Sequence, residues 1–177
     1  MITEILLSLL FLLSGKMIFE GKSQFIGNLS VKFIHYFSDN FMYLIKPINS
    51  KRAFAIDPVD HKRIAHEVIG LGTSLESILC THHHADHDGG NIPLKRLYPQ
   101  LDVFGIDERI HGLTNQLKEQ PVQDLKVCGL DVKVLHTPCH TTGHRCVFWA
   151  MREKTPINCL LYFRYKWSSK VKKKTRS

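Results

Sequence analysis

The apolar and polar positions near the start of the chain predict a run of short β-strands. Apolar residues alternate with polar ones over 31–37, and a second apolar run follows the turn at Asp39–Asn40. A third, shorter apolar run ends at Asp57–Pro58. The predicted strands are 31–37, 41–45 and 53–56, joined by turns at 39–40 and 46–50.

A helical periodicity replaces this alternation after residue 59 and predicts a helix over 60–71. Asp60 stands at the N-cap position, and Gly70 and Gly72 mark the stop. Further strands are expected over 77–81, 102–105, 122–127, 130–135 and 145–151, and further helices over 91–98 and 107–117. Strands that alternate with helices after a leading hairpin indicate an α/β layered domain.

Composition indicates an ordinary globular body with a basic tail. The 177 residues can form one domain with a sizeable core, and 44% of them are hydrophobic. The net charge is +8, but seven basic residues follow residue 163 and no acidic residue follows Glu153. Subtracting those seven leaves about +1 for the body. We therefore expect no nucleic-acid partner, and a nuclease function is disfavoured.

Two further features bear on the compartment. The apolar run 5–13 is too short to span a bilayer as a helix, and Glu4 precedes it where a signal peptide would carry a positive charge. Five cysteines without a C-x-x-C pair suggest reduced thiols. We expect a cytoplasmic or mitochondrial protein without a membrane-spanning segment, and secretion is not expected.

The stretch 81–91 contains the candidate metal ligands. It holds four histidines and two aspartates directly after an apolar strand, and imidazole and carboxylate are ligand types that suit zinc, iron or manganese. His82 and His84 project to one side of an extended segment, whereas His83 points to the other. A tight turn must follow, since Gly89–Gly90 permit close backbone approach. A histidine-rich surface loop without metal is the alternative, and the ordered pattern H-x-H-x-D-H disfavours it.

This pattern resembles the signature of the metallo-β-lactamase superfamily, and most closely that of the glyoxalase II group, the hydroxyacylglutathione hydrolases. The stretches 38–45, 55–58 and 137–144 are similar to the first hairpin, the next strand end and the second ligand loop of that group. The resemblance covers residues 31–160. A branch of the family linked to a movement disorder shares the stretch 78–82, so both branches stay open.

The resemblance implies a fold and a division of the chain. The fold would be the N-terminal half of an αββα sandwich, and half a sandwich would leave an apolar sheet face uncovered. The chain would divide into an N-terminal apolar segment and linker (1–30), an incomplete metallo-β-lactamase-like domain (31–160) and a basic tail (161–177).

The resemblance also implies the site. His82, His84 and His140 would hold one metal ion, and Asp86 and His87 would belong to a second. The cofactor would be Zn²⁺, two ions per site, with iron or manganese as alternatives. Asp57 would accept hydrogen bonds from the ligand loop and so fix ligand orientation, without touching metal.

The implied reaction is hydrolysis of a 2-hydroxyacyl thioester of glutathione, such as S-lactoylglutathione. Two adjacent cations would yield a hydroxide nucleophile and polarise the thioester carbonyl, and Asp86 would orient the water and take a proton. The sequence assigns no substrate-binding residue.

The sequence departs from the family pattern after residue 158. The family has a Gly-Asp whose carboxylate bridges both metals, and a later histidine ligand; here Arg164 stands about where that aspartate should be, and no aspartate or histidine follows His144. We expect an empty second metal site and impaired activity, as in a truncated or alternative product. The other interpretations are a non-catalytic interaction module and a mononuclear iron persulfide dioxygenase. Two metal equivalents per chain would favour the hydrolase, and none or one the module.

Overall fold

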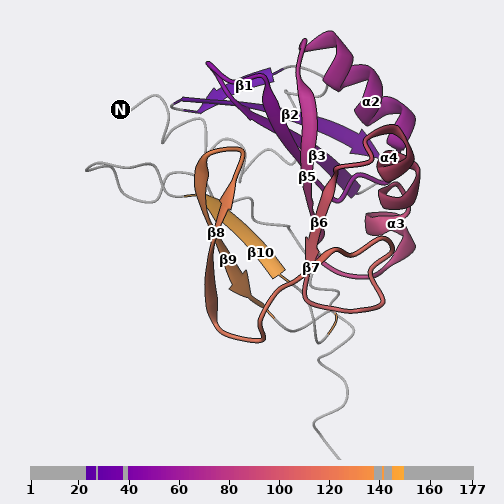
Figure 1. Ribbon diagram of the computed structural model, residues 1–177, viewed down its shortest axis with the longest axis vertical. Helices are drawn as coiled ribbons and strands as arrows, with labels where there is room; N and C mark the ends of the chain where they lie inside the picture. Colours follow the sequence, from indigo (N-terminus) through magenta and orange to yellow (C-terminus); the bar gives the residue numbers. More distant parts are fainter. Residues whose placement is uncertain (1–22, 27, 38–39, 138–140, 142–144, 150–177) are drawn as a thin grey trace, which may run out of the picture.

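Two β-sheets form the frame of the protein. The computed structural model describes residues 23–26, 28–37, 40–137, 141 and 145–149. Within them, a seven-stranded sheet has the order β1-β2-β3-β4-β5-β6-β7, and a three-stranded sheet has the order β10-β9-β8 (Figure 1). The strands of the larger sheet are β1 (Ser23–Ile26), β2 (Leu29–Tyr36), β3 (Asn40–Pro47), β4 (Arg52–Ile56), β5 (Ser74–Leu79), β6 (Asp102–Gly105) and β7 (Asn115–Gln116). Those of the smaller sheet are β8 (Val122–Val127), β9 (Leu130–His136) and β10 (Arg145–Trp149).

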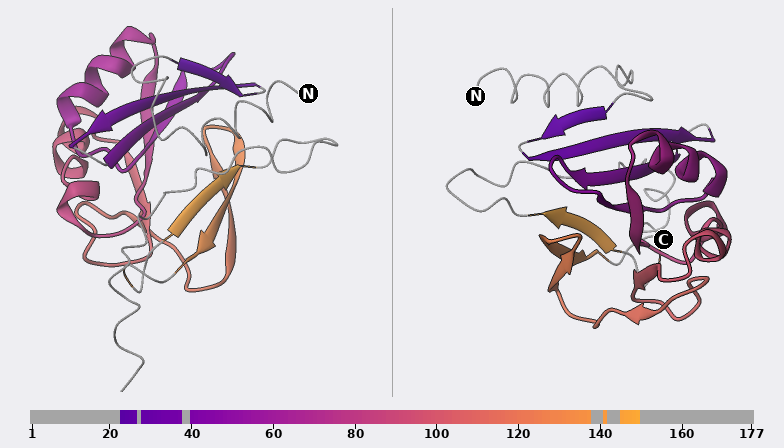
Figure 2. Two further views of the ribbon diagram at one scale, coloured as in Figure 1. Left: turned by 180° about the vertical axis from the view of Figure 1, so that it is seen from behind. Right: turned by 45° about the horizontal axis from the view of Figure 1, so that its top comes forward.

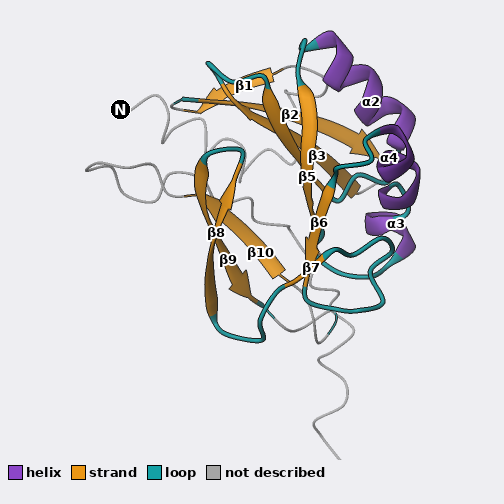
Figure 3. Cartoon of the chain, in the orientation of Figure 1, coloured by secondary structure: helices purple, strands orange, loops and turns teal. Residues whose placement is uncertain are grey.

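Among the described residues, helices α2 (His61–Gly70), α3 (Ala85–Asp88) and α4 (Asn91–Leu97) lie along one side of the larger sheet (Figures 1 and 3). The smaller sheet lies on its other side (Figures 1, 2 and 3). The side chain of Asp60 accepts hydrogen bonds from the backbone N–H groups of Lys62 and Arg63, which confirms the predicted N-cap. The α/β fold class predicted from the sequence is confirmed.

Strand β4 shows why both faces of the larger sheet are apolar. Ala53 and Ala55 belong to the core on the helix side, whereas Phe54 and Ile56 belong to the core between the sheets. All four are at most 1% exposed. A strand covered on both faces reads as a continuous apolar run, and each large side chain buried this way contributes about 1.5–3 kcal/mol.

The outer face of the β8–β9 hairpin is charged. Lys126 and Asp131 pair across the strands at 2.7 Å, and Lys133 and Asp124 pair at 2.6 Å. The turn at Cys128–Gly129 has φ angles of 52° and 81°, the two positive values that a tight hairpin turn requires. On this face Asp124, Lys126, Asp131 and Lys133 are charged, whereas Val122 is apolar and 45% exposed. The expectation of an uncovered apolar sheet face stays a prediction.

The prediction of a helix over 107–117 is wrong. The segment forms turns and then β7. The carboxylate of Asp107 accepts a hydrogen bond from the backbone N–H of Arg109 at 3.0 Å, a local bond that competes with helix formation. Gly112 has φ +72°, which no right-handed helix contains. The hydrogen bond from the Arg109 backbone to Asp107 and the left-handed conformation of Gly112 therefore account for the absence of a helix in this segment.

The remaining elements agree with the patterns, with local exceptions. The helix expected over 91–98 appears as α4, and the larger sheet begins earlier than expected, with β1 before residue 31. None of the helices in the described ranges is both long and apolar enough to cross a membrane. The apolar run 5–13, the expected ligand His140 and the basic tail lie outside the described residues.

Candidate metal centre

The candidate site lies where two parallel strands end. β4 and β5 pair in parallel with Ile56 opposite Leu79, so the residues after each strand meet at one edge of the sheet. Asp57 follows β4 and turns at φ 47°. Thr81 and His82 follow β5, and both are at most 2% exposed.

Asp57 is the hub of a buried hydrogen-bond network. Its Oδ1 accepts from the backbone N–H of Thr81 at 2.8 Å, and its Oδ2 accepts from the Thr81 hydroxyl at 2.7 Å. Nδ1 of His87 lies 2.9 Å from the same Oδ2. Asp57 is 1% exposed, and a buried carboxylate is stable only with such partners. The structure therefore places Asp57 against the loop that bears the expected ligands.

The network determines which ring nitrogens can bind a metal. A carboxylate only accepts, so His87 donates from Nδ1 to Asp57 and presents the lone pair of Nε2. The Thr81 hydroxyl has one proton, which it donates to Asp57, so it accepts from Nδ1 of His82 at 2.9 Å. His82 therefore also presents the lone pair of Nε2. Metal-binding histidines are usually held in one tautomer in this way.

The expected ligands of the first segment lie together. The ring centroid of His82 is 4.7 Å from that of His84 and 4.1 Å from that of His87. Oδ2 of Asp86 lies 3.6 Å from Nε2 of His87. The turn of α3 produces this cluster, because the backbone N–H groups of His87 and Asp88 donate to the carbonyl of His84 at 2.8 and 3.0 Å.

Asn40, at the start of β3, holds the carboxylate of Asp86. Its Nδ2 donates to Oδ2 of Asp86 at 2.7 Å and lies 3.3 Å from the Asp86 carbonyl oxygen. Partial burial raises the pKa of Asp86, but the hydrogen bond from Asn40 and the charge of His87 outweigh it and lower the pKa below its usual value. Sequence reasoning placed Asn40 in a turn and gave it no role in the site. The only signal was its position in the hairpin stretch that resembles the family.

Opposing effects act on His87. Burial lowers its pKa, but the hydrogen bond and charge of Asp57, together with the charges of Asp86 and Asp88, raise the pKa above its usual value. A cation at Nε2 must displace the additional proton.

The donors present suit a divalent metal ion. Imidazole nitrogens and a carboxylate from one tight turn are a common zinc or iron donor set. In the described part of the chain, no three His, Cys, Asp or Glu side chains complete a metal site by themselves. His140, the expected third ligand for the metal at His82 and His84, lies outside the described residues. The assignment of all five ligands stays a prediction.

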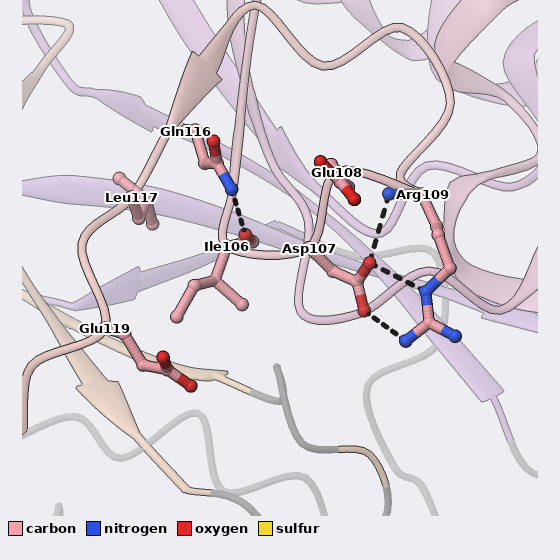
Figure 4. A pocket seen from close by; sticks show the side chains of 7 residues that line it. All are labelled: Ile106, Asp107, Glu108, Arg109, Gln116, Leu117 and Glu119. Atoms are coloured by element: carbon pink, nitrogen blue, oxygen red, sulfur yellow. Dashed lines mark hydrogen bonds and ion pairs between the residues drawn. The ribbon is translucent and has the colours of Figure 1, made fainter.

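A hollow of about 580 Å³ lies at the β6–β7 end of the sheet (Figure 4). The cation in its lining is Arg109, which is already paired with Asp107 at 2.6 Å. Two further carboxylates, Glu108 and Glu119, line the same space. An anionic substrate would find no unpaired cation in this lining, so the hollow receives no substrate assignment.

Two vertebrate proteins are similar to this chain over 120 residues. The hydroxyacylglutathione hydrolase-like protein of Gallus gallus is 42% identical and that of Homo sapiens is also 42% identical, in each case over 68% of this chain. The matched region is 42% and 41% of their own lengths, so the chain spans about two fifths of these relatives. No protein-family model matches the sequence.

Solved structures of the same fold include ETHE1 from Myxococcus xanthus. It is 27% identical with a TM-score of 0.56, over 75% of this chain and 54% of that one. The BLEG-1 B3 metallo-beta-lactamase has a TM-score of 0.57 at 19% identity, over 67% and 66% of the two chains. The second likeness shows the fold alone.

Proposed function

This chain belongs to the metallo-β-lactamase superfamily and, within it, to the hydroxyacylglutathione hydrolase-like family, and we propose that it takes part in metal-dependent thioester hydrolysis. The observation that carries the proposal is the network at Asp57, which directs Nε2 of both His82 and His87 away from their hydrogen-bonded sides. Two histidines that were buried for packing alone would not both need a fixed tautomer.

We propose that His82, His84 and His140 hold one metal ion and that Asp86 and His87 contribute to a second. When bound, such ions supply an ionised water nucleophile and polarise the thioester carbonyl. Zinc is the ion we expect, because imidazole-rich sites with a carboxylate suit it, and iron and manganese are alternatives.

Asp86 is the base in this proposal. The lowered pKa keeps its carboxylate ionised at neutral pH, and Asn40 holds one of its oxygens. Asp86 would take a proton from the attacking water and return it to the departing thiolate. Water and a 2-hydroxyacyl thioester of glutathione would then become a 2-hydroxy acid and free glutathione.

Occupancy of the second metal position is expected to be low in this chain. Arg164 stands about where the family has its bridging aspartate, and a cation there would repel a metal ion rather than balance its charge. We therefore expect slow turnover and about one metal ion per chain.

Three measurements on the purified full chain test the proposal. Metal analysis gives the number of ions per chain, S-lactoylglutathione tests for thiol release, and glutathione persulfide tests for oxygen consumption. Bound metal with thiol release supports the hydrolase, even at a low rate. Oxygen consumption without thiol release would instead support the mononuclear iron dioxygenase, an alternative that the likeness to ETHE1 keeps open. Because about one ion is expected of this hydrolase as well, turnover decides between the two: a chain that binds no metal or one ion and turns over neither substrate would be a non-catalytic interaction module.

A further inference from the structure

The loop between β6 and β7, residues 106–114, contacts the ligand segment at two places. In one, Nδ1 of His83 lies 3.1 Å from Oδ2 of Asp107. In the other, Oδ2 of Asp88 accepts from the backbone N–H of His111 at 3.0 Å and lies 3.0 Å from Nδ1 of its ring. The two contacts are reciprocal, because each segment contributes one aspartate and one histidine. We call them the clasp.

The Asp107 end of the clasp is held by Arg109. Nε of Arg109 donates to Oδ1 at 2.9 Å and Nη2 donates to Oδ2 at 2.6 Å (Figure 4). Such two-pronged pairs are directional. The Arg109 hydrogen bond, with smaller help from the charge of His83, holds the pKa of Asp107 well below its usual value. Asp107 is thus a fixed anion beside His83, whose side chain is 18% exposed.

The Asp88 end of the clasp is buried. Asp88 is 0% exposed, whereas the ring of His111 is 62% exposed. A buried carboxylate is costly without compensation, and the docked loop supplies the partners of its Oδ2. Asn91 adds a third contact, donating from Nδ2 to the His111 carbonyl at 3.0 Å.

The clasp brackets the expected ligands. On the ligand segment its two ends are His83 and Asp88, and His84, Asp86 and His87 lie between them. The segment 83–88 therefore contacts one loop at both ends, and Asp57 contacts it through His87, next to Asp88. Contacts at these three residues restrict the backbone of the turn and so limit the positions that its side chains can take.

We propose that Asp107 and His111 are positioning residues for the metal centre. They touch no metal themselves, and they hold the turn in the conformation that brings His84, Asp86 and His87 together. The inference rests on the proposed function, because it requires that this segment binds metal. Groups that hydrogen-bond directly to metal ligands typically change metal affinity about 10–100-fold when removed, and Asp107 and His111 act one contact further out, so the lower end of this range is expected.

The test compares D107N and H111A with H66A in the full-length chain. His66 is an exposed histidine on α2, so H66A matches H111A in chemistry without touching the site. Zn²⁺ affinity is measured by competition with a chelator, and the visible absorption of bound Co²⁺ reports ligand geometry. The thermal stability of each metal-free variant is recorded as well. Because the His111 ring is exposed, H111A should fold even if D107N does not.

We expect D107N and H111A each to weaken Zn²⁺ binding about tenfold and to change the Co²⁺ spectrum, with H66A unchanged. H111N should restore much of the affinity, because its amide can donate from the place of Nδ1. Wild-type affinity and spectrum in H111A would overturn the clasp and leave the proposed function standing. A wild-type chain that binds no metal would overturn the proposed function, and the clasp with it.

Discussion

Thr81 donates its hydroxyl proton to Asp57 across 2.7 Å, and this bond decides which nitrogen of the next residue, His82, would be available to a metal ion. Since the proton is committed to the carboxylate, the Thr81 oxygen can only accept from His82. One carboxylate thereby orients two histidines, His87 directly and His82 through a hydroxyl.

Replacing this hydroxyl should weaken metal binding. T81V removes a hydrogen bond to a buried carboxylate and leaves Nδ1 of His82 without its acceptor, so we expect about tenfold weaker Zn²⁺ affinity and a stability loss of about 1.5–3 kcal/mol. T81S keeps the hydroxyl and is the matched control. Chelator competition and urea unfolding measure the two effects. Equal metal affinity in T81V and T81S would contradict the assigned tautomer.

Asn40 should affect turnover more than stability. Its amide donates to Asp86 at 2.7 Å near the protein surface. The loss of a hydrogen bond there changes the free energy of unfolding by about 0.5 kcal/mol or less. With N40A we expect about tenfold lower kcat with little change in KM, because the base loses its fixed orientation. Steady-state thiol release measures both constants. A rise in KM alone would show that Asn40 acts on substrate binding instead.

Metal affinity and metal-free stability should respond to pH in opposite directions through His87. The raised pKa of His87 adds stability that is complete below its ordinary value of 6.5 and is lost as pH rises through the folded value. A cation held by His82 and His84 lies beside the ring of His87 and is repelled by its proton, so Zn²⁺ affinity should fall as pH drops below that pKa. Unfolding and chelator competition between pH 5.5 and about 8.5 give both curves. H87Q should make both stability and Zn²⁺ affinity less dependent on pH. If the two curves of the unmodified chain changed with pH in the same direction, the role assigned to His87 would be refuted.

Gly90 should not tolerate a side chain. A Cβ there would lie 1.7 Å from the carbonyl oxygen of Pro58, so G90A must displace the ligand turn from the strand end that carries Asp57. We expect the free energy of unfolding to fall by at least about 3 kcal/mol and metal binding to weaken. Gly70 is the control, because a Cβ at that helix position meets nothing within 4 Å, and G70A should gain about 0.5–1 kcal/mol. Chemical unfolding of both variants tests the pair, and a stable G90A would show that the turn can shift freely.

Two thiols should be unreactive in the folded protein. Burial raises the pKa of Cys80 well above its usual value, and burial raises the pKa of the Cys128 thiol to about 12. Since the thiolate is the reactive form, iodoacetamide at pH 8 should modify neither until the chain unfolds. Peptide mapping by mass spectrometry reads out each site. Rapid labelling of Cys80 would mean that the end of β5 opens in solution.

Local patterns predicted most elements of the fold. The N-cap at Asp60, the hairpin through Cys128 and the strand before the ligand segment all depend on short-range rules, and the structure contains them. The prediction of a helix over 107–117 was wrong because two local effects prevent it. These are the hydrogen bond from the Arg109 backbone to Asp107 and the left-handed conformation of Gly112. Strand β1 lies before the alternation that begins at residue 31 and was not predicted.

The sequence by itself determined that histidines and aspartates follow a buried strand in an order suited to divalent metal, and that Asp57 ends the strand before. It did not reveal that Asn40 reaches Asp86, that Thr81 connects Asp57 to His82, or that the loop bearing Asp107 and His111 clasps the ligand segment. Only tertiary structure decided these contacts. Side chains 23 to 46 positions apart meet because the ends of parallel β4, β5 and β6 lie at one sheet edge, beside the start of antiparallel β3. Such pairings leave no periodic trace in a single chain.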